Sequence, residues 1–288
     1  MARTAHTQRW RRLLLAAVAA GLLAGVSPAA AAPGVQGLVS QPVVGESWAG
    51  YDVIAAAPTA GFTPYFTRVS GDWIEPAAAC ASVKAAQASF WVGLGGALDT
   101  SATYGPLQIG ADSDCVGGHA SYLVWYEAFP EPVVTVAMRV RPGNLLSASV
   151  SLNSAGNPVV ALRDETTGAA FARTLSQIHL QPLATDSAEW IVEGPYYRHP
   201  PLLADFGHVD FSDATATQVG PNGSHTGPIV DPAWRYSEPD ILSGDESGVY
   251  EPRVEQYAAP TALNPAGDGF TVGFGPIATG ASFIDAPQ

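Results

Sequence analysis

Short stretches in which apolar and polar residues alternate recur from residue 47 almost to the end of the chain. Examples are Ser47–Ile54, Phe66–Ile74, Ala88–Gly96, Tyr122–Phe129 and Ser187–Glu193, all rich in aromatic and β-branched residues. A period of two with this composition predicts β-strands, and the scattered prolines and glycines between them mark turns. Helical periodicity is almost absent beyond the N-terminal segment. The pattern predicts an all-β fold, an antiparallel β-sandwich of two packed sheets.

Other stretches predict how neighbouring strands pair. Val133–Arg141 and Leu145–Leu152 are expected to form a pair around a Pro-Gly-Asn turn. Val159–Asp164 and Ala169–Leu175 flank Glu-Thr-Thr-Gly, which is a hairpin signal. Leu202–Phe211 is expected to be one further strand.

The N-terminal segment has the pattern of a secretory signal peptide. Residues 1–31 contain four arginines, then an apolar run from Leu13 to Val26, then Ala29-Ala30-Ala31 as a cleavage site. We expect residues 32–46 to form a short lead-in or prosegment, and 47–288 to form a single β-sandwich domain. The protein is therefore expected to be secreted.

Charge and cysteine content restrict the partners and the compartment. The chain carries 26 acidic against 13 basic residues, a formal net charge of −13. Such a surface repels nucleic acid and anionic membranes, so we expect neither as a partner after signal removal, and we expect a monomer. Cys80 and Cys115 are the two cysteines; in an exported chain they favour one disulfide over two free thiols.

The strand Ser187–Glu193 carries two acids on one face. Alternation places Glu189, Ile191 and Glu193 together, opposite Trp190 and Val192. Glu193 ends the strand just before Gly-Pro, a rigid place to hold a catalytic group. The alternative is that both glutamates lie on the solvated face of an antiparallel sheet.

Several common catalytic motifs are missing. The chain has no G-x-S-x-G, H-E-x-x-H or Walker A sequence, and its histidines lack the spacing of a zinc site. We therefore predict no metal and no cofactor. The remaining candidates for chemistry are carboxylates, a glutamine and tryptophans.

Seven motifs in order resemble the glutamic peptidases, or eqolisins, over residues 47 to 211. They are Ser47-Trp48-Ala49-Gly50, Gly71-Asp72-Trp73-Ile74, Trp91-Val92-Gly93, Leu107-Gln108-Ile109-Gly110, Trp125-Tyr126-Glu127, Ala188-Glu189-Trp190-Ile191-Val192-Glu193 and Ala204-Asp205-Phe206. Each motif alone is weak, but their shared order and similar gaps are specific. The resemblance implies a concanavalin-like or legume-lectin-like β-sandwich with catalysis on one sheet.

The resemblance also implies roles for particular residues. It assigns the catalytic pair to Gln108 and Glu193, the second acid of its strand. The implied substrate-binding residues are Trp48, Trp91, Asp112, Trp125, Glu127 and Phe129. Two positions depart from the family pattern: Gly95 stands where an aspartate is usual, and Phe129 where a tyrosine is usual.

Residue chemistry makes a peptidase plausible, with protein or peptide substrates. As a carboxylate, Glu193 can take a proton from water and return it to the leaving nitrogen. Gln108 can hold that water and donate to the developing oxyanion. A glutamate starting near its reference pKa of about 4.3 would favour acid conditions. The alternatives are a carbohydrate-active enzyme using Glu127 and Glu193, or a secreted β-sandwich that binds without catalysis.

Overall fold

The computed structural model describes residues 44–45, 47–59, 61–97, 106–176, 185–194, 202–238, 240–242 and 256–276. These residues belong to one compact unit, Gly37–Gln288. The signal peptide expected at 1–31 lies outside the described residues, as does the lead-in except for 44–45. Within the described part of the chain, no helix is long and apolar enough to cross a membrane.

Ten strands form the first sheet. Its spatial order is β1 (Val44–Gly45), β17 (Asp240–Leu242), β18 (Gln256–Pro260), β19 (Phe270–Pro276), β14 (His208–Gly220), β3 (Tyr65–Ile74), β9 (Leu145–Leu152), β10 (Pro158–Asp164) and β11 (Ala170–Thr174), with β15 (Gly223–Pro228) paired to β14. Every pair in this sheet is antiparallel except β1–β17. We call it the ten-stranded sheet.

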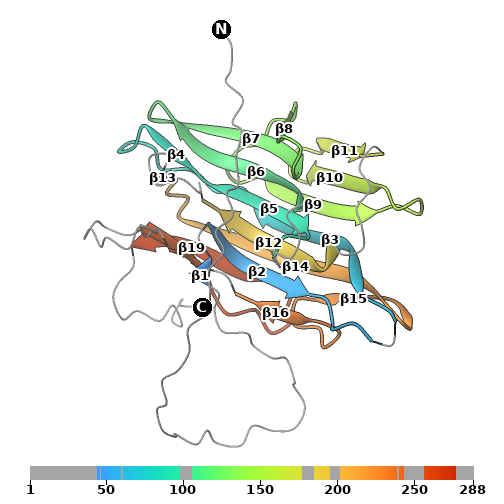
Figure 1. The fold of residues 1–288 in the computed structure, drawn as a ribbon. Helices are drawn as coiled ribbons and strands as arrows, with labels where there is room; N and C mark the ends of the chain where they lie inside the picture. The colour runs from blue at the N-terminus through green and yellow to red at the C-terminus, as the bar shows by residue number, and fades with distance from the viewer. Residues whose placement is uncertain are drawn as a thin grey trace, which may run out of the picture. The chain divides into compact units, whose positions relative to one another are not determined.

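Nine strands form the second sheet, which we call the nine-stranded sheet (Figure 1). Its order is β13 (Leu202–Leu203), β4 (Ala85–Gln87), β6 (Leu107–Val116), β5 (Ser89–Leu94), β12 (Ser187–Glu193), β2 (Trp48–Ile54) and β16 (Arg235–Ser237), with β7 (His119–Ala128) paired to β6 and β8 (Val134–Val136) paired to β7. The predicted all-β sandwich of two sheets is confirmed.

The predicted pairings have mixed outcomes. The β10–β11 hairpin is confirmed, with Leu162 opposite Phe171. The expected pairing of 133–141 with 145–152 is wrong, because β8 pairs with β7 while β9 pairs with β3 and β10. The turn before β9, closed by a bond from the amide of Asn144 to the carbonyl of Arg141, carries the chain from one sheet to the other. The strand expected at 202–211 is divided between β13 and β14.

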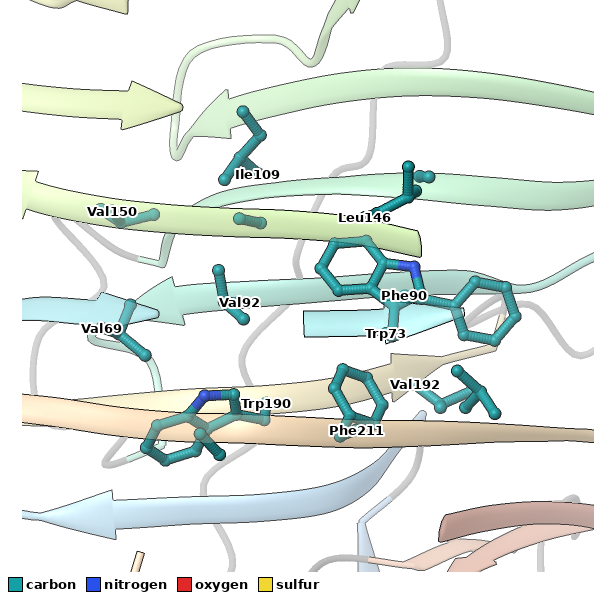
Figure 2. Packing of buried hydrophobic residues seen from close by; sticks show 14 of the residues in the cluster. Val69, Trp73, Phe90, Val92, Ile109, Leu146, Val150, Trp190, Val192 and Phe211 are labelled. Carbon is teal, nitrogen blue, oxygen red and sulfur yellow. The ribbon is translucent and has the colours of Figure 1, made fainter. Parts of the chain in front are cut away.

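The main core lies between the two sheets (Figure 2). Trp73 and Phe211 of the ten-stranded sheet and Phe90 and Trp190 of the nine-stranded sheet are buried in it. Burying such a side chain contributes roughly 2 to 3 kcal/mol, so this layer is the main source of stability. The residues that point away from it on the nine-stranded sheet are then free to form a site.

One tryptophan joins the two sheets directly. The Trp190 indole N–H donates to the backbone carbonyl of Ser70 at 2.9 Å. A methyl group at Gly71 would lie 2.7 Å from Cδ1 of that indole, so the glycine makes the close approach possible. This bond fixes β12, the strand that carries Glu189 and Glu193, against β3.

Candidate active site

The candidate residues lie on the outer face of the nine-stranded sheet. On β12, Glu189, Ile191 and Glu193 point away from the main core, as the alternation predicts. Register then sets their neighbours across the strands. Glu193 lies opposite Trp48 on β2 and Ser89 on β5, and Ile191 lies opposite Trp91.

Strands β5, β6 and β7 supply the rest of the site. Gln108 on β6 is directly opposite Gly93 on one side and Glu127 on the other. Asp112 lies opposite Ser89 on β5. Gly110 lies between Trp91 on β5 and Trp125 on β7 in the strand register. All seven strand residues proposed from the family resemblance therefore come to one sheet face. They are Trp48, Trp91, Gln108, Asp112, Trp125, Glu127 and Glu193.

An apolar cluster forms the floor of this face. Trp91, Trp125 and Ile191 are buried together, with Trp48 and Leu123 packed against them. The Trp48 and Trp91 rings meet edge to face, with centroids 4.9 Å apart and an interplanar angle of 81°. This cluster is separate from the main core, and it keeps the neighbouring carboxyl groups out of water.

Gln108 is held by one end of its amide. Its Nε2 donates to Oε2 of Glu127 at 2.8 Å, and the side chain is only 5% exposed. Its Oε1 is buried and has no hydrogen-bond partner among the described residues. An unpaired buried acceptor costs about 1 to 3 kcal/mol, so this end of the amide calls for a partner.

Glu193 is held by the tryptophans. The Trp91 indole N–H donates to Glu193 Oε2 at 3.0 Å. The pKa of Glu193 is raised to about 7, chiefly by burial and also by the charge of Glu127, while hydrogen bonds from Trp48 and Trp91 oppose the rise. The expectation that this glutamate starts near its reference pKa is therefore wrong, because its surroundings remove it from water. Below neutral pH Glu193 is a carboxylic acid.

Asp112 forms a second pairing of a tryptophan with an acid. Its Oδ1 accepts hydrogen bonds from the Trp125 indole N–H at 2.5 Å and from the Ser89 hydroxyl at 2.6 Å. Burial raises the pKa of Asp112 well above its usual value, and the nearby charge of Asp114 adds to this. Asp112 therefore accepts a hydrogen bond from Trp125 as Glu193 does from Trp91, and the bond fixes the Trp125 ring.

The remaining acids of this face are also shielded. Glu127 has a raised pKa because of burial, opposed by its bond from Gln108. Glu189 is completely buried, and burial raises its pKa well above the usual value, with Asp52 on the neighbouring strand adding to the effect. Neither oxygen of Glu189 has a hydrogen-bond partner among the described residues. Burial therefore favours the neutral, protonated form of Glu189.

The two departures from the family pattern lie at strand ends. Gly95 follows β5 with a φ of 78°, and its amide donates to the carbonyl of Ser187. Phe129 follows β7, and its amide donates to the carbonyl of Pro106 at 3.2 Å. Phe129 thus follows the site strand that carries Trp125 and Glu127.

The predicted disulfide between Cys80 and Cys115 is present. It ties the loop before β4 to the far end of β6, the strand that carries Gln108 and Asp112. The bridge therefore anchors a site strand at the end away from Gln108. Among the described residues, no cluster of three or more His, Cys, Asp or Glu side chains is arranged to hold a metal ion.

Two hollows in the described part of the protein lie elsewhere. One of about 420 Å³ is lined by Ile74 and Phe206, and one of about 750 Å³ lies over Ser70 and Ser149 on the ten-stranded sheet. Neither is lined by Gln108 or Glu193. The chemistry of the side chains, and not the size of a hollow, identifies the site.

Sequence reasoning missed three contributors. Ser89 and Asp52 act across strand pairs, as partners of Asp112 and Glu189, and a single sequence carries no signal for register. Gly93 leaves the space that the ring of Trp91 occupies, since a methyl at Gly93 would lie 2.7 Å from Cζ3 of the indole.

A glutamine and a glutamate on the outer face of an antiparallel sandwich agree with the resemblance to the eqolisins. The model of the Peptidase A4 family matches residues 46–235, and the chain belongs to this family. It is 34% identical to Aspergillopepsin-2 of Aspergillus niger over 144 residues, which is 49% of each chain. The chain thus matches about half the length of this curated relative.

Solved structures share the fold. A scytalido-glutamic peptidase bound to a peptide-based transition state analogue aligns with a TM-score of 0.58 and 21% identity, covering 81% of this chain and all of that one. SCP-B, an eqolisin in complex with the tripeptide Ala-Ile-His, aligns with a TM-score of 0.54 and 20% identity, covering 82% of this chain and all of that one. At sequence identities this low, the likeness shows that these proteins share the β-sandwich fold.

Proposed function

We propose that this protein is a secreted, acid-acting glutamic endopeptidase in which Gln108 and Glu193 activate water to hydrolyse peptide bonds. The observation that carries the proposal is the state of Gln108. Its amide is fixed through Nε2 by Glu127, and its buried Oε1 has no partner among the described residues. A water molecule bound at Oε1 would satisfy that acceptor and be held on the same face as Glu193.

Family membership and the peptide ligands support peptide substrates. The chain belongs to the Peptidase A4 family, and two proteins of similar fold carry a peptide-based analogue and a tripeptide in their solved structures. The partly buried indole of Trp48 offers apolar area beside the acids, and the buried rings of Trp91 and Trp125 lie beneath it. A peptide lying across this face would find both shape and hydrogen-bond acceptors.

The raised pKa of Glu193 determines how it works in acid. Below about pH 7 its carboxyl group carries a proton. As the water on Gln108 attacks the peptide carbonyl carbon, one oxygen of Glu193 gives its proton to the carbonyl oxygen. The other oxygen takes a proton from the water. The products of this step are a neutral gem-diol and a carboxylic acid that is still protonated.

Breakdown of the gem-diol uses the same group in reverse. Glu193 donates its proton to the nitrogen, the C–N bond breaks, and a proton of the diol returns to the carboxylate. The second hydrogen on Gln108 Nε2, which the bond to Glu127 does not use, can donate to the carbonyl oxygen as negative charge develops there. The active form is thus the protonated one, which accounts for action in acid.

Secretion rests on the N-terminal pattern and on the disulfide. Residues 1–31 have the charge, apolar run and cleavage site of a signal peptide. The bond between Cys80 and Cys115 fits an oxidising compartment outside the cytosol. Residues 32–46 as a prosegment, residues 47–288 as the peptidase domain and a monomeric state are part of the same proposal.

The test is proteolysis of a denatured protein by the purified chain without residues 1–43, which keeps β1, from pH 2 to 7. We expect new peptide termini at acid pH from the wild type. The same digestion should fail with Glu193→Gln and with Gln108→Ala, while Ser149→Ala on the ten-stranded sheet digests like the wild type. A folded wild type that cleaves nothing at any pH, or a Glu193→Gln variant that cleaves normally, would refute the proposal.

A further inference from the structure

The Trp91 indole lies in a confined position above Gly93. A methyl group at Gly93 would lie 2.7 Å from Cζ3 and 3.2 Å from Cε3 of the indole. The same methyl would lie 3.2 Å from Oε2 of Glu189. The six-membered ring of Trp91 and the carboxyl group of Glu189 therefore share the space that the missing side chain leaves.

The opposite edge of the same indole makes the bond to Glu193. In an indole, Cε3 and Cζ3 lie on one edge of the bicycle, and Nε1 lies on the other. Because the ring is rigid, fixing the first edge above Gly93 fixes the direction of the N–H bond that reaches Glu193 Oε2 at 3.0 Å. Trp91 is completely buried, and Trp48 packs on it at 4.9 Å, so the ring has no free rotation to compensate.

Glu189 forms one wall of this position and has no other evident task. It is completely buried, and no hydrogen bond of ordinary geometry reaches either oxygen from the described residues, while the nearby Ser187 side chain and Ala97 amide lower its pKa only in part. It points to the same outer face as Glu193, and it lies directly opposite Gly93 in the strand register. A fully buried acid is costly, so its presence at this place needs a reason.

We propose that Gly93 and Glu189 form a seat for the Trp91 indole, and that this seat positions the carboxyl group of Glu193. Both are positioning residues that act through Trp91. This inference rests on the proposed function for its kinetic consequences, but the seat itself is a structural claim. It can be tested without any cleavage assay.

The titratable groups around the seat are few. Glu127 faces Glu193 from β7. Asp52 faces Glu189 from β2, and Asp186 approaches it from the start of its own strand. The Trp91 hydrogen bond lowers the pKa of Glu193, so its loss raises that pKa. A variant that weakens this hydrogen bond should therefore raise the pKa of Glu193.

The test compares Gly93→Ala with Gly273→Ala. Gly273 lies on β19 of the ten-stranded sheet, and a methyl there would meet no atom within 4 Å, so it is a matched control. The readout is the ¹⁵N-indole NMR signal of Trp91, identified by its absence in Trp91→Phe. In the wild type we expect this signal to titrate near pH 7, and Glu193→Gln should abolish that titration.

In Gly93→Ala we expect the Trp91 signal to move and its titration midpoint to shift upward or vanish, whereas Gly273→Ala matches the wild type. For an active enzyme, Gly93→Ala should lower kcat roughly 10- to 100-fold at little change in KM. It should also move the fall of kcat/KM at high pH upward, which a general loss of folded protein would not do. A Gly93→Ala signal and titration identical to the wild type would overturn the inference.

A second variant covers the case in which Gly93→Ala does not fold. Glu189→Ala removes one wall of the seat without adding bulk, and we expect it to shift or broaden the Trp91 signal as well. An unchanged Trp91 signal in Glu189→Ala would then decide against the seat. If the wild type cleaves no peptide but these NMR effects are seen, the proposed function fails and the seat stands.

Discussion

The outer faces of the two sheets follow the same alternation but carry different chemistry. Across the ten-stranded sheet, one row of the register contains only small side chains: Thr215, Ser70, Ser149, Ala161 and Ala172. The matching face of the nine-stranded sheet carries indoles and carboxyl groups that are largely buried. A sandwich needs only its inner faces to be apolar, so this difference is not required by the fold.

The charges on the two faces also differ in their access to water. On the ten-stranded sheet Arg163 pairs with Glu165 at 3.0 Å, and both side chains are well exposed. Such a pair contributes at most about 1 kcal/mol. On the nine-stranded sheet Asp52, Glu189 and Glu193 are shielded, and their pKa values are raised. This concentration of shielded carboxyl groups makes the outer face of the nine-stranded sheet the candidate functional face.

Glu193→Gln should break this comparison most completely. The amide keeps the shape of the side chain but cannot exchange a proton with substrate. We expect kcat/KM to fall roughly 10³- to 10⁴-fold, the upper range for loss of general acid–base catalysis. Initial rates on a peptide substrate at pH 4 measure this, with near-UV circular dichroism to verify the fold. A loss smaller than tenfold would contradict the assignment.

Gln108→Ala should have the next largest effect. The variant loses both the acceptor for water and the donor for the oxyanion, which is worth roughly 10²- to 10³-fold in kcat. It also removes the hydrogen bond that lowers the pKa of Glu127, so the pKa of Glu127 should rise further. Steady-state kinetics test the first effect, and carboxyl NMR titration tests the second. Full activity in this variant would contradict the catalytic role of Gln108 and leave it a structural one.

Asp52→Asn should change how stability depends on pH. Burial raises the pKa of Asp52 to about 6, above its unfolded value, so the folded state holds this proton more tightly. Its contribution is fully present below about pH 4 and is lost as the pH rises toward about 6. We therefore expect the protein to be more stable at pH 4 than at pH 8, and the variant to reduce that difference by up to about 3 kcal/mol. Urea unfolding at both pH values measures it.

The opposite result for the wild type, greater stability at pH 8 than at pH 4, would show that these acids are solvated or paired in a way the structure does not contain. Glu165→Gln, an exposed acid of the ten-stranded sheet, is the control, and it should leave the difference between the two pH values nearly unchanged.

Ser149→Ala should have the smallest effect. It removes one hydroxyl from the row of small residues on the ten-stranded sheet, and substitutions of this kind usually stay within about 0.5 kcal/mol. Activity should equal that of the wild type. A clear loss of peptide cleavage would mean that the ten-stranded sheet also takes part in function, and the contrast between the two faces would be weaker than we describe.

Much of the fold could be predicted from the sequence, because alternation is a local property. The strand Ser187–Glu193 is present with the predicted bounds, and Glu189 and Glu193 share the predicted face. The predicted pairing of 133–141 with 145–152 failed for a different reason. A short turn with Pro and Gly fits both a hairpin and a crossing between sheets, and local residues do not distinguish the two.

The sequence predicted which residues lie at the site better than it predicted their chemistry. Motif order placed Gln108 and Glu193 on one face, but the pKa of Glu193 depends on burial by Trp91 and on the charge of Glu127, which lie on other strands. The role of Gly93 likewise depends on the orientation of the Trp91 ring. Such properties follow from register and packing, and a single sequence does not state them.

The most direct test of the central claim is the pH dependence of kcat/KM for a small quenched peptide between pH 3 and 8.5. If protonated Glu193 is the working group, the value should be high in acid and fall about tenfold for each pH unit above its pKa of about 7. The fall should follow the titration of Glu193 seen by NMR. A kcat/KM that instead rises through this range would show that the carboxylate is the active form, and would contradict the mechanism proposed for this face.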